Sequence, residues 1–288
     1  MTHAAALRRR LGQPDALKVP GVFDGLSALL VERAGFEAAF LSGASLAYTR
    51  FGRPDLGLVS FAELLGTVRT LRERIALPLI VDIDTGFGNA LNVARTVREL
   101  EKAGASALQM EDQLAPKRCG HMRGKQVVSG AEMVGKIRAA LDARRDAATL
   151  IVARTDALTV EGFDAALERA ERYVEAGADL LFVEAPSTVE QMRTISARFG
   201  SRVPLVHNLV EGGRSPVANA TELQDVGYRV GLYPAMLAHL FARQAELCLR
   251  RLQEEGGTTA FAGELYDIAS INELLGAPGM LELAARYA

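Results

Sequence analysis

Three acidic residues near the middle of the chain have the types and spacing of a metal site. Asp82 and Asp84 alternate in the segment Val-Asp-Ile-Asp-Thr-Gly-Phe-Gly, which ends one apolar run, and Glu111 ends the next. Residues at i and i+2 of an extended strand point to the same face, so we expect both aspartates to project together. Clustered carboxylates repel one another unless they are neutralised, and an all-oxygen site suits Mg²⁺, or Mn²⁺ as the second choice. Acids that are simply solvated in a loop are the alternative.

A polar segment follows Glu111 and surrounds one of the two cysteines. Residues 111–128 read EDQLAPKRCGHMRGKQVV, without helical or strand periodicity, and cations flank Cys119 on both sides. Cations near a thiol lower its pKa, and a long loop after a barrel strand is a usual place for a lid. We therefore expect Cys119 to act as a proton donor or nucleophile, with His121 binding an anion or tuning the thiol. A free surface cysteine in an anion-binding loop is the alternative.

Other polar residues also stand where apolar runs end. Arg154 closes Ile-Val-Ala-Arg, where a charge is costly unless it meets an anion, and its planar guanidinium suits a substrate carboxylate. An ion pair with Glu184 or Asp156 is the alternative. Ser42, Gly43 and Ala44 offer consecutive backbone N–H groups to carboxylate oxygens. Because strand ends meet at one rim of a barrel, we expect these residues to converge.

Two further residues favour structural interpretations. His207 stands near a strand end, where a hydrogen-bonded structural histidine is favoured over a catalytic one. Cys248 lies in a helical pattern over residues 242–252, where a packed thiol is favoured over a reactive one. Two cysteines are also too few for a disulfide framework.

The elements that must position these residues alternate between strand and helix. Short apolar runs predict eight strands, near residues 19, 38, 79, 107, 150, 180, 204 and 229. Helical stretches end in Ala-Gly at Gly35, Gly104 and Gly177, which are typical helix stops. Continuously apolar strands are typical of a parallel sheet that is covered on both faces. Eight such units favour a closed (β/α)8 barrel of the TIM type over an open doubly wound sheet, because no Gly-x-Gly-x-x-Gly follows the first run.

Composition and segmentation restrict the classes of protein further. The 288 residues carry 33 Lys and Arg against 35 Asp and Glu, so the chain lacks the basic field that attracts nucleic acid or anionic membranes. No apolar run reaches the roughly 18 residues of a membrane span, and no signal peptide is evident. We expect a cytoplasmic protein with one barrel domain over about residues 17–254. A helical tail over about residues 255–288 is expected to pack on the barrel or on another subunit.

Ordered motifs give the chain a family resemblance over about residues 19–254. It resembles the isocitrate lyase and phosphoenolpyruvate mutase superfamily through Leu-Ser-Gly-Ala from Leu41, Pro-Asp-Leu-Gly from Pro54, Asp-Ile-Asp-Thr-Gly-Phe-Gly-Asn from Asp82, Glu-Asp-Gln from Glu111, Lys-Arg-Cys-Gly-His from Lys117, Ala-Arg-Thr-Asp from Ala153, Phe-Val-Glu-Ala from Phe182 and Asn-Leu-Val-Glu-Gly-Gly from Asn208. The cysteine motif is similar to that of the carbon–carbon lyase branch. Within this branch the chain most resembles 2,3-dimethylmalate lyase and the petal death protein. The 2-methylisocitrate lyases come next, and they typically have tyrosine where Phe40 stands.

The resemblance implies a role for each matching residue. Ser42, Gly43, Ala44 and Arg154 would hold the 2-oxoacid half of a substrate, and Asp82, Asp84 and Glu111 would position Mg²⁺, partly through water. Cys119 would be the general acid. Gly120, His121, Glu184 and Asn208 would bind the other half, and Asp55 matches a further active-site acid of the family.

The resemblance also implies an assembly and a reaction. A C-terminal helix would be exchanged between the subunits of a homotetramer, a dimer of dimers. The expected reaction is Mg²⁺-dependent retro-aldol or retro-Claisen cleavage of a 2-hydroxydicarboxylate of the 2-alkylmalate type. Within the same fold the alternatives are cleavage of 2-methylisocitrate, a tricarboxylate, to pyruvate and succinate, and hydrolysis or decarboxylation of oxaloacetate. A non-catalytic anion-binding barrel is the alternative from another class.

Overall fold

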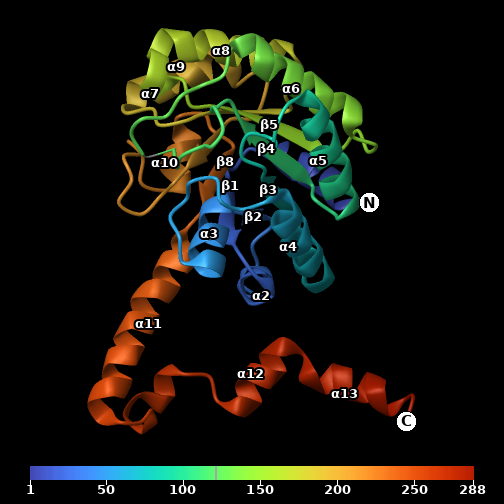
Figure 1. Ribbon diagram of the computed structural model, residues 1–288, viewed down its shortest axis with the longest axis vertical. Helices are drawn as coiled ribbons and strands as arrows, with labels where there is room; N and C mark the ends of the chain where they lie inside the picture. The colour runs from blue at the N-terminus through green and yellow to red at the C-terminus, as the bar shows by residue number, and fades with distance from the viewer. Residues whose placement is uncertain (121) are drawn as a thin grey trace. The chain divides into compact units, whose positions relative to one another are not determined.

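The computed structural model describes residues 1–120 and 122–288, and its strands form one parallel sheet that curls into a barrel (Figure 1). Within the described residues the eight strands are β1 (Leu17–Val22), β2 (Ala39–Leu41), β3 (Leu79–Asp82), β4 (Ala107–Glu111), β5 (Leu150–Thr155), β6 (Leu180–Val183), β7 (Val206–Asn208) and β8 (Val230–Tyr233). Their order is β6-β5-β4-β3-β2-β1-β8-β7. A parallel bridge between Leu181 and Leu205 joins the two ends of the sheet, so the barrel is nearly closed. The predicted TIM-type (β/α)8 fold is confirmed, with each strand within two residues of its expected position.

Helices alternate with the strands along the chain, and those that connect two strands lie outside the barrel (Figure 1). They are α1 (His3–Leu11), α2 (Gly25–Arg33), α3 (Gly43–Phe51), α4 (Phe61–Arg74), α5 (Ala90–Lys102), α6 (Gly130–Ala143), α7 (Leu158–Glu161), α8 (Phe163–Glu175), α9 (Val189–Phe199), α10 (Ala220–Asp225), α11 (Met236–Glu255), the 3₁₀ helix η1 (Thr259–Glu264), α12 (Ile268–Leu275) and α13 (Ala277–Ala285). Gly35, Gly104 and Gly177 have φ of 79°, 101° and 101° just after α2, α5 and α8, as helix stops require. None of the helices in the described ranges is both long and apolar enough to span a membrane.

Residues along each strand alternate between the inside of the barrel and the layer beneath the helices. In β6, Leu180 and Phe182 belong to the interior cluster, whereas Leu181 and Val183 pack under the helices. Leu7 and Leu11 of α1 join the interior cluster. Their neighbour Arg8 bonds to the carbonyls of residues 147 and 148, just before β5, so α1 covers the N-terminal end of the barrel.

The same alternation selects the residues at the other end of the barrel. Continuing the interior-facing series of β3, β5, β6 and β7 by two residues leads to Asp82, Arg154, Glu184 and Asn208, and continuing that of β4 from Ala107 by four residues leads to Glu111. Each of these is a polar residue that was named as a candidate site residue from the sequence. The alternation that buries apolar side chains inside the barrel therefore also points these polar side chains toward the barrel axis at its C-terminal end.

The chain divides into two compact units, residues 1–238 and 239–288. The first contains the barrel. The second contains most of α11 together with η1, α12 and α13, and within it Arg251 pairs with Glu264 at 2.6 Å and covers the ring of Phe261. The division falls inside α11, earlier than the tail boundary expected near residue 255. Exchange of this unit between subunits stays a prediction.

Candidate active site

The two predicted metal-binding aspartates converge, although strand alternation is not the reason. Strand β3 ends at Asp82, and Asp84 lies beyond it in a left-handed conformation with φ of 47°. The backbone N–H of Asp84 donates to Asp82 Oδ1 over 3.2 Å. A Cβ on Gly43 would lie 3.2 Å from Asp82 Oδ2 and 3.3 Å from Asp84 Oδ1, so both carboxylates face the start of α3. A tight turn therefore brings together the side chains that the sequence had assigned to one strand face.

Glu111, the last residue of β4, lies buried beside these aspartates. Its backbone N–H donates to the Asp84 carbonyl over 2.9 Å, and its Oε2 lies 3.3 Å from Arg154 Nε. Its Oε1 is buried without a hydrogen-bond partner among the described residues. Burial raises the pKa of Glu111 well above its usual value, against the opposing charge of Arg154. Burial likewise raises the pKa of Asp84 to about 6, against the opposing charge of Lys117. The cluster is thus short of positive charge.

Lys117 stands inside this acidic cluster. Its Nζ lies 2.5 Å from Asp55 Oδ1 and 2.9 Å from Asp84 Oδ1, and all three side chains are largely buried. Burial lowers the pKa of Lys117, but the charges of Asp84, Glu111 and Asp55 outweigh burial and raise it well above its usual value. The sequence had placed Lys117 in a loop over the site and Asp55 as a further acid. The structure pairs these two residues with each other.

The donor set of the cluster fits a hydrated divalent cation. Across residues 1–120 and 122–288, no three His, Cys, Asp or Glu side chains already form an arrangement that could hold a metal ion. Mg²⁺, however, retains several waters and takes only one or two carboxylates directly, so its protein ligands need not enclose it. Asp82, Asp84 and Glu111 supply oxygen donors only, and the unpartnered Glu111 Oε1 and the raised pKa values both favour an added cation.

The start of α3 lies next to the aspartates. Ser42 caps the helix, and its side chain accepts from the N–H of Ser45 over 3.3 Å. The N–H of Gly43 reaches Asp82 Oδ2 at 3.4 Å. The backbone groups of Ser42, Gly43 and Ala44, which the sequence suggested as a carboxylate nest, are therefore the first turn of a helix. The N-terminus of a helix attracts anions through its free N–H groups and its dipole.

Arg154 lies at the end of β5 and is surrounded by carboxylates. Its Nε lies 2.9 Å from Asp156 Oδ2, and its Nη2 lies 3.1 Å from Asp156 Oδ1 and 3.8 Å from Glu184 Oε2. Arg154 is therefore ion-paired with both Asp156 and Glu184, the two partners that the sequence suggested as an alternative to a substrate carboxylate. Burial lowers the pKa of Arg154, but these carboxylates outweigh burial and raise it. A substrate carboxylate at Arg154 would share the guanidinium with acids that already fix its orientation.

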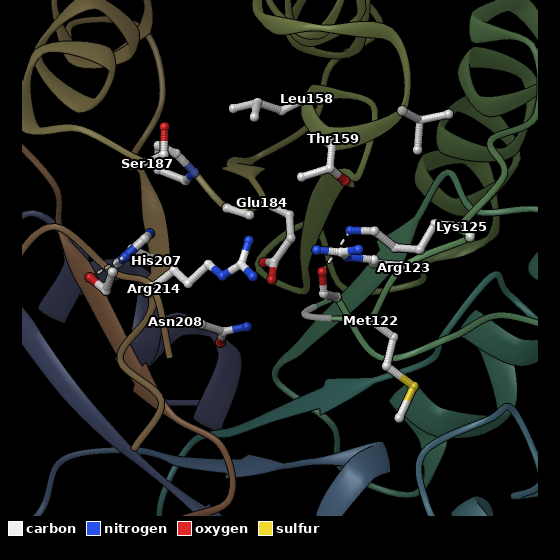
Figure 2. A pocket seen from close by; sticks show the side chains of 16 residues that line it. Met122, Arg123, Lys125, Leu158, Thr159, Glu184, Ser187, His207, Asn208 and Arg214 are labelled. Carbon is white, nitrogen blue, oxygen red and sulfur yellow. Dashed lines mark hydrogen bonds between the residues drawn. The ribbon is translucent and has the colours of Figure 1, made fainter. Parts of the chain in front are cut away.

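Residues 113–127 with the exception of residue 121, hereafter the Cys119 loop, are held in place by side chains at both ends. Gln113 brackets the backbone of Arg118, donating to its carbonyl over 2.8 Å and accepting from its N–H over 3.0 Å. Lys125 Nζ donates to the Gly120 carbonyl (Figure 2) and to Asp156 Oδ1, both over 2.7 Å. The loop is therefore a folded structure that is tied to the acid at the end of β5.

Cys119 is half-buried within this loop. Its N–H donates to the Asp55 carbonyl over 3.1 Å, and Met122 N–H donates to the Cys119 carbonyl over 2.8 Å. Arg118, a neighbouring cation, donates to the carbonyl of Arg123. The described lysines of the loop are bonded to carboxylates, so the structure uses their charge to hold the loop. His121, which the sequence assigned to catalysis and substrate binding, lies outside the described residues.

Gly120 brings the loop against the barrel rim. A Cβ at this position would lie 2.3 Å from Glu184 Oε1 and 2.4 Å from Arg154 Nη2. A residue with a Cβ would therefore force the ends of these two side chains to shift, so glycine suits the close approach of the backbone beside Cys119. The predicted site residues Gly120, Glu184 and Arg154 are thus brought into one place.

A cavity of about 420 Å³ opens beside Gly120, over the ends of β5, β6 and β7 (Figure 2). Glu184 and Asn208, both predicted from the sequence, line it, and Asn208 Oδ1 is buried without a hydrogen-bond partner among the described residues. The apolar side chains that line the cavity are Met122, Leu158, Val160 and Pro186. Two arginines, Arg123 and Arg214, line it as well. Arg214 was not predicted from the sequence, although a cation in the Gly-Gly-Arg-Ser-Pro turn after a predicted strand was a usable signal. His207 has the structural role expected of it, since its Nε2 lies 2.8 Å from Ser215 Oγ.

Comparison with known proteins shows which family the chain belongs to. The family model described as phosphoenolpyruvate phosphomutase matches residues 7–251. The 2-methylisocitrate lyase of Aeropyrum pernix is 44% identical over 270 residues, which are 94% of this chain and 86% of that protein. The 2,3-dimethylmalate lyase of Eubacterium barkeri is 38% identical over 288 residues, which are 100% of this chain and 99% of that protein.

Solved structures of the same superfamily are also similar to this chain. A crystal structure of 2,3-dimethylmalate lyase matches with a TM-score of 0.93 and 30% identity, covering 100% of this chain and 96% of that one. Phosphonopyruvate hydrolase in complex with oxalate and Mg²⁺ matches with a TM-score of 0.89 and 31% identity, covering 100% and 99%. The chain therefore belongs to the phosphoenolpyruvate mutase and isocitrate lyase superfamily, and it is a carbon–carbon bond lyase of that superfamily.

Proposed function

We propose that the chain is a Mg²⁺-dependent lyase that cleaves a 2-hydroxydicarboxylate of the 2-alkylmalate type into a 2-oxoacid and a carboxylic acid. The observation that carries this proposal is the division of the barrel rim. An acidic cluster with a helix N-terminus lies at the ends of β2, β3 and β4, and the cavity lies over β5, β6 and β7. The backbone N–H of Cys119 donates to the Asp55 carbonyl on the acidic side of the rim. The adjacent Gly120 lines the cavity on the other side. A proton donor thus stands between two subsites.

The 2-oxoacid half of the substrate suits the acidic side. Asp82, Asp84 and Glu111 would hold Mg²⁺, which when bound polarises the 2-hydroxy group and its neighbouring carboxylate. The first turn of α3 and the guanidinium of Arg154 supply donors for that carboxylate. The choice of metal is supported by phosphonopyruvate hydrolase, a structurally similar protein whose structure was solved in complex with oxalate and Mg²⁺.

The chain's own residues then direct the bond cleavage. The 2-hydroxyl proton passes to a base or to solvent water, and the resulting C2 alkoxide forms the carbonyl of the 2-oxoacid. The C2–C3 bond breaks, and its electron pair passes into the C3 carboxylate as an enediolate. The Cys119 thiol donates its proton to C3, which leaves a thiolate and releases the carboxylic acid. Tyr48, whose pKa is raised by burial and by the charges of Cys119 and Asp55, lies near this thiol.

The cavity supports an alkyl-bearing departing half, because Met122, Leu158, Val160 and Pro186 offer it apolar contacts. Phe40 is buried in the barrel interior and contributes no hydroxyl to the site. Cleavage of 2-methylisocitrate is the second candidate. Its departing half carries an additional carboxylate, and the two arginines of the cavity favour that group.

A substrate panel with Mg²⁺ tests the proposal. Purified protein is assayed with 2,3-dimethylmalate, 2-methylisocitrate and oxaloacetate, and 2,3-dimethylmalate is expected to give the highest kcat/KM. Cys119→Ser should bind substrate but turn it over roughly 10²- to 10⁴-fold more slowly, the range that one general acid contributes. Cys248→Ser, on α11, is the matched control and should keep its activity. Full activity in Cys119→Ser, or no product from any substrate, would refute the proposed function.

A further inference from the structure

Arg214, an arginine that lines the cavity, directly follows a hydrogen-bonded turn after β7. Gly213 N–H donates to the Val210 carbonyl over 2.9 Å, which closes the turn just before Arg214. The next residue, Ser215, bonds to His207 at 2.8 Å and donates to the Val217 carbonyl over 2.8 Å. Because His207 belongs to β7 and is followed by Asn208, the backbone of Arg214 is tied to the strand that carries a predicted substrate ligand.

The guanidinium of Arg214 points into the cavity toward Glu184, and Asn208 lines the same cavity (Figure 2). The rim cations Lys117, Lys125 and Arg154 are already paired with carboxylates at distances of 2.5 to 3.8 Å. Arg214 is exposed, and among the residues that the structure describes it has no ion pair within 4.0 Å. It is therefore a cation that the protein leaves available to a ligand.

We infer that Arg214, together with the Asn208 amide, binds the carboxylate of the departing half of the substrate. This inference rests on the proposed function, in which the first carboxylate lies at Arg154 and α3. The second carboxylate would lie on the other side of the scissile bond, beyond Cys119. A planar guanidinium binds a carboxylate through two parallel hydrogen bonds, and Glu184 would keep Arg154 as its own partner.

The role of Arg214 extends from binding to turnover. Cleavage converts the departing carboxylate into an enediolate, which carries more negative charge than the ground state. A donor fixed at this position is therefore stronger in the transition state, and its loss lowers kcat as well as raising KM. Asn208 contributes a neutral donor only, so it cannot replace the charge.

The test separates the two halves of the substrate. Arg214→Ala and Arg214→Lys are compared with Arg193→Ala, an exposed arginine of α9 that does not line the cavity. For 2,3-dimethylmalate the products are pyruvate and propionate, and each is tested as an inhibitor. We expect the inhibition constant for propionate to rise roughly 10- to 100-fold in Arg214→Ala, the usual cost of a charged hydrogen bond. Inhibition by pyruvate should stay within about twofold, and Arg214→Lys should recover part of the loss.

Direct binding distinguishes failure of this inference from failure of the proposed function. Propionate and succinate are titrated by calorimetry into the protein loaded with Mg²⁺ and oxalate, an experiment that needs no turnover. Wild-type protein that binds these acids, with the loss confined to Arg214→Ala, supports the subsite even if no substrate of the panel is cleaved. Equal binding of the acids by Arg214→Ala and the wild type overturns the inference. So does an equal loss of oxalate binding, because it would assign Arg214 a general structural role.

Discussion

Replacing Lys125 by methionine removes the ammonium that ties the Cys119 loop to the barrel. Methionine keeps a long apolar stem and removes only the charged end. In the structure that end lies 2.7 Å from the Gly120 carbonyl and 2.7 Å from Asp156 Oδ1. The side chain of Lys125 is 2% exposed and that of Asp156 is 0% exposed, so water cannot readily replace the lost bonds. We expect a less stable protein with a more open loop.

The size of the effect follows from Asp156. Burial raises the pKa of Asp156, but the charges of Arg154 and Lys125 outweigh it and lower the value from 3.8 to about 2. Because the folded-state pKa is depressed, this stabilisation is fully present above about pH 4 and is lost as the pH falls toward 2. The shift corresponds to about 2 kcal/mol, which the two cations share. With about 1 to 3 kcal/mol for the unpaired Gly120 carbonyl, Lys125→Met should cost about 2 to 4 kcal/mol at pH 7.

Urea unfolding at pH 7 measures the loss of stability, and its repetition down to pH 3 should show the difference between variant and wild type narrowing. Loop opening is followed by the rate at which iodoacetamide labels Cys119, in a Cys248→Ser background, and it should increase. Lys102→Met, at the exposed end of α5, is the matched control, with an expected effect within about 0.5 kcal/mol. A loss below about 0.5 kcal/mol in Lys125→Met, with labelling unchanged, would refute this account of the loop.

Three further outcomes are expected. Gly120→Ala would place a Cβ 2.3 Å from Glu184 Oε1, so it should abolish turnover while the thermal melting curve of the barrel is retained; a fully active variant would contradict the packing described. Removal of divalent metal with EDTA should abolish activity, and added Mg²⁺ should restore it, whereas activity that survives exhaustive chelation excludes a metal at Asp82, Asp84 and Glu111. Light scattering should give the mass of four copies of the 30.9 kDa chain, and a monomer at all concentrations would count against the expected homotetramer.

The positions of the strands could be predicted because buried parallel strands are continuously apolar and because α2, α5 and α8 are each followed by a glycine that ends the helix. The polar rim followed from the same pattern, since the interior-facing series of β3 to β7 end in polar side chains. Pairing across the rim could not be predicted. Lys117 bonds to Asp55, 62 positions away, and Lys125 bonds to Asp156, 31 positions away, and nothing local in the sequence identifies such partners. The left-handed turn at Asp84 was equally hidden, because aspartate rarely adopts that conformation.

The two loop lysines act on opposite sides of Cys119. Lys117 ties the loop to Asp55 and Asp84 on the acidic side of the rim, and Lys125 ties it to Asp156 beside the cavity. Because Cys119 N–H bonds to Asp55 independently of Lys125, loss of Lys125 should displace the cavity side of the loop more than the acidic side. Lys125→Met should therefore weaken the binding of the departing carboxylic acid more than that of oxalate. Equal weakening of both would mean that the loop moves as a single rigid piece.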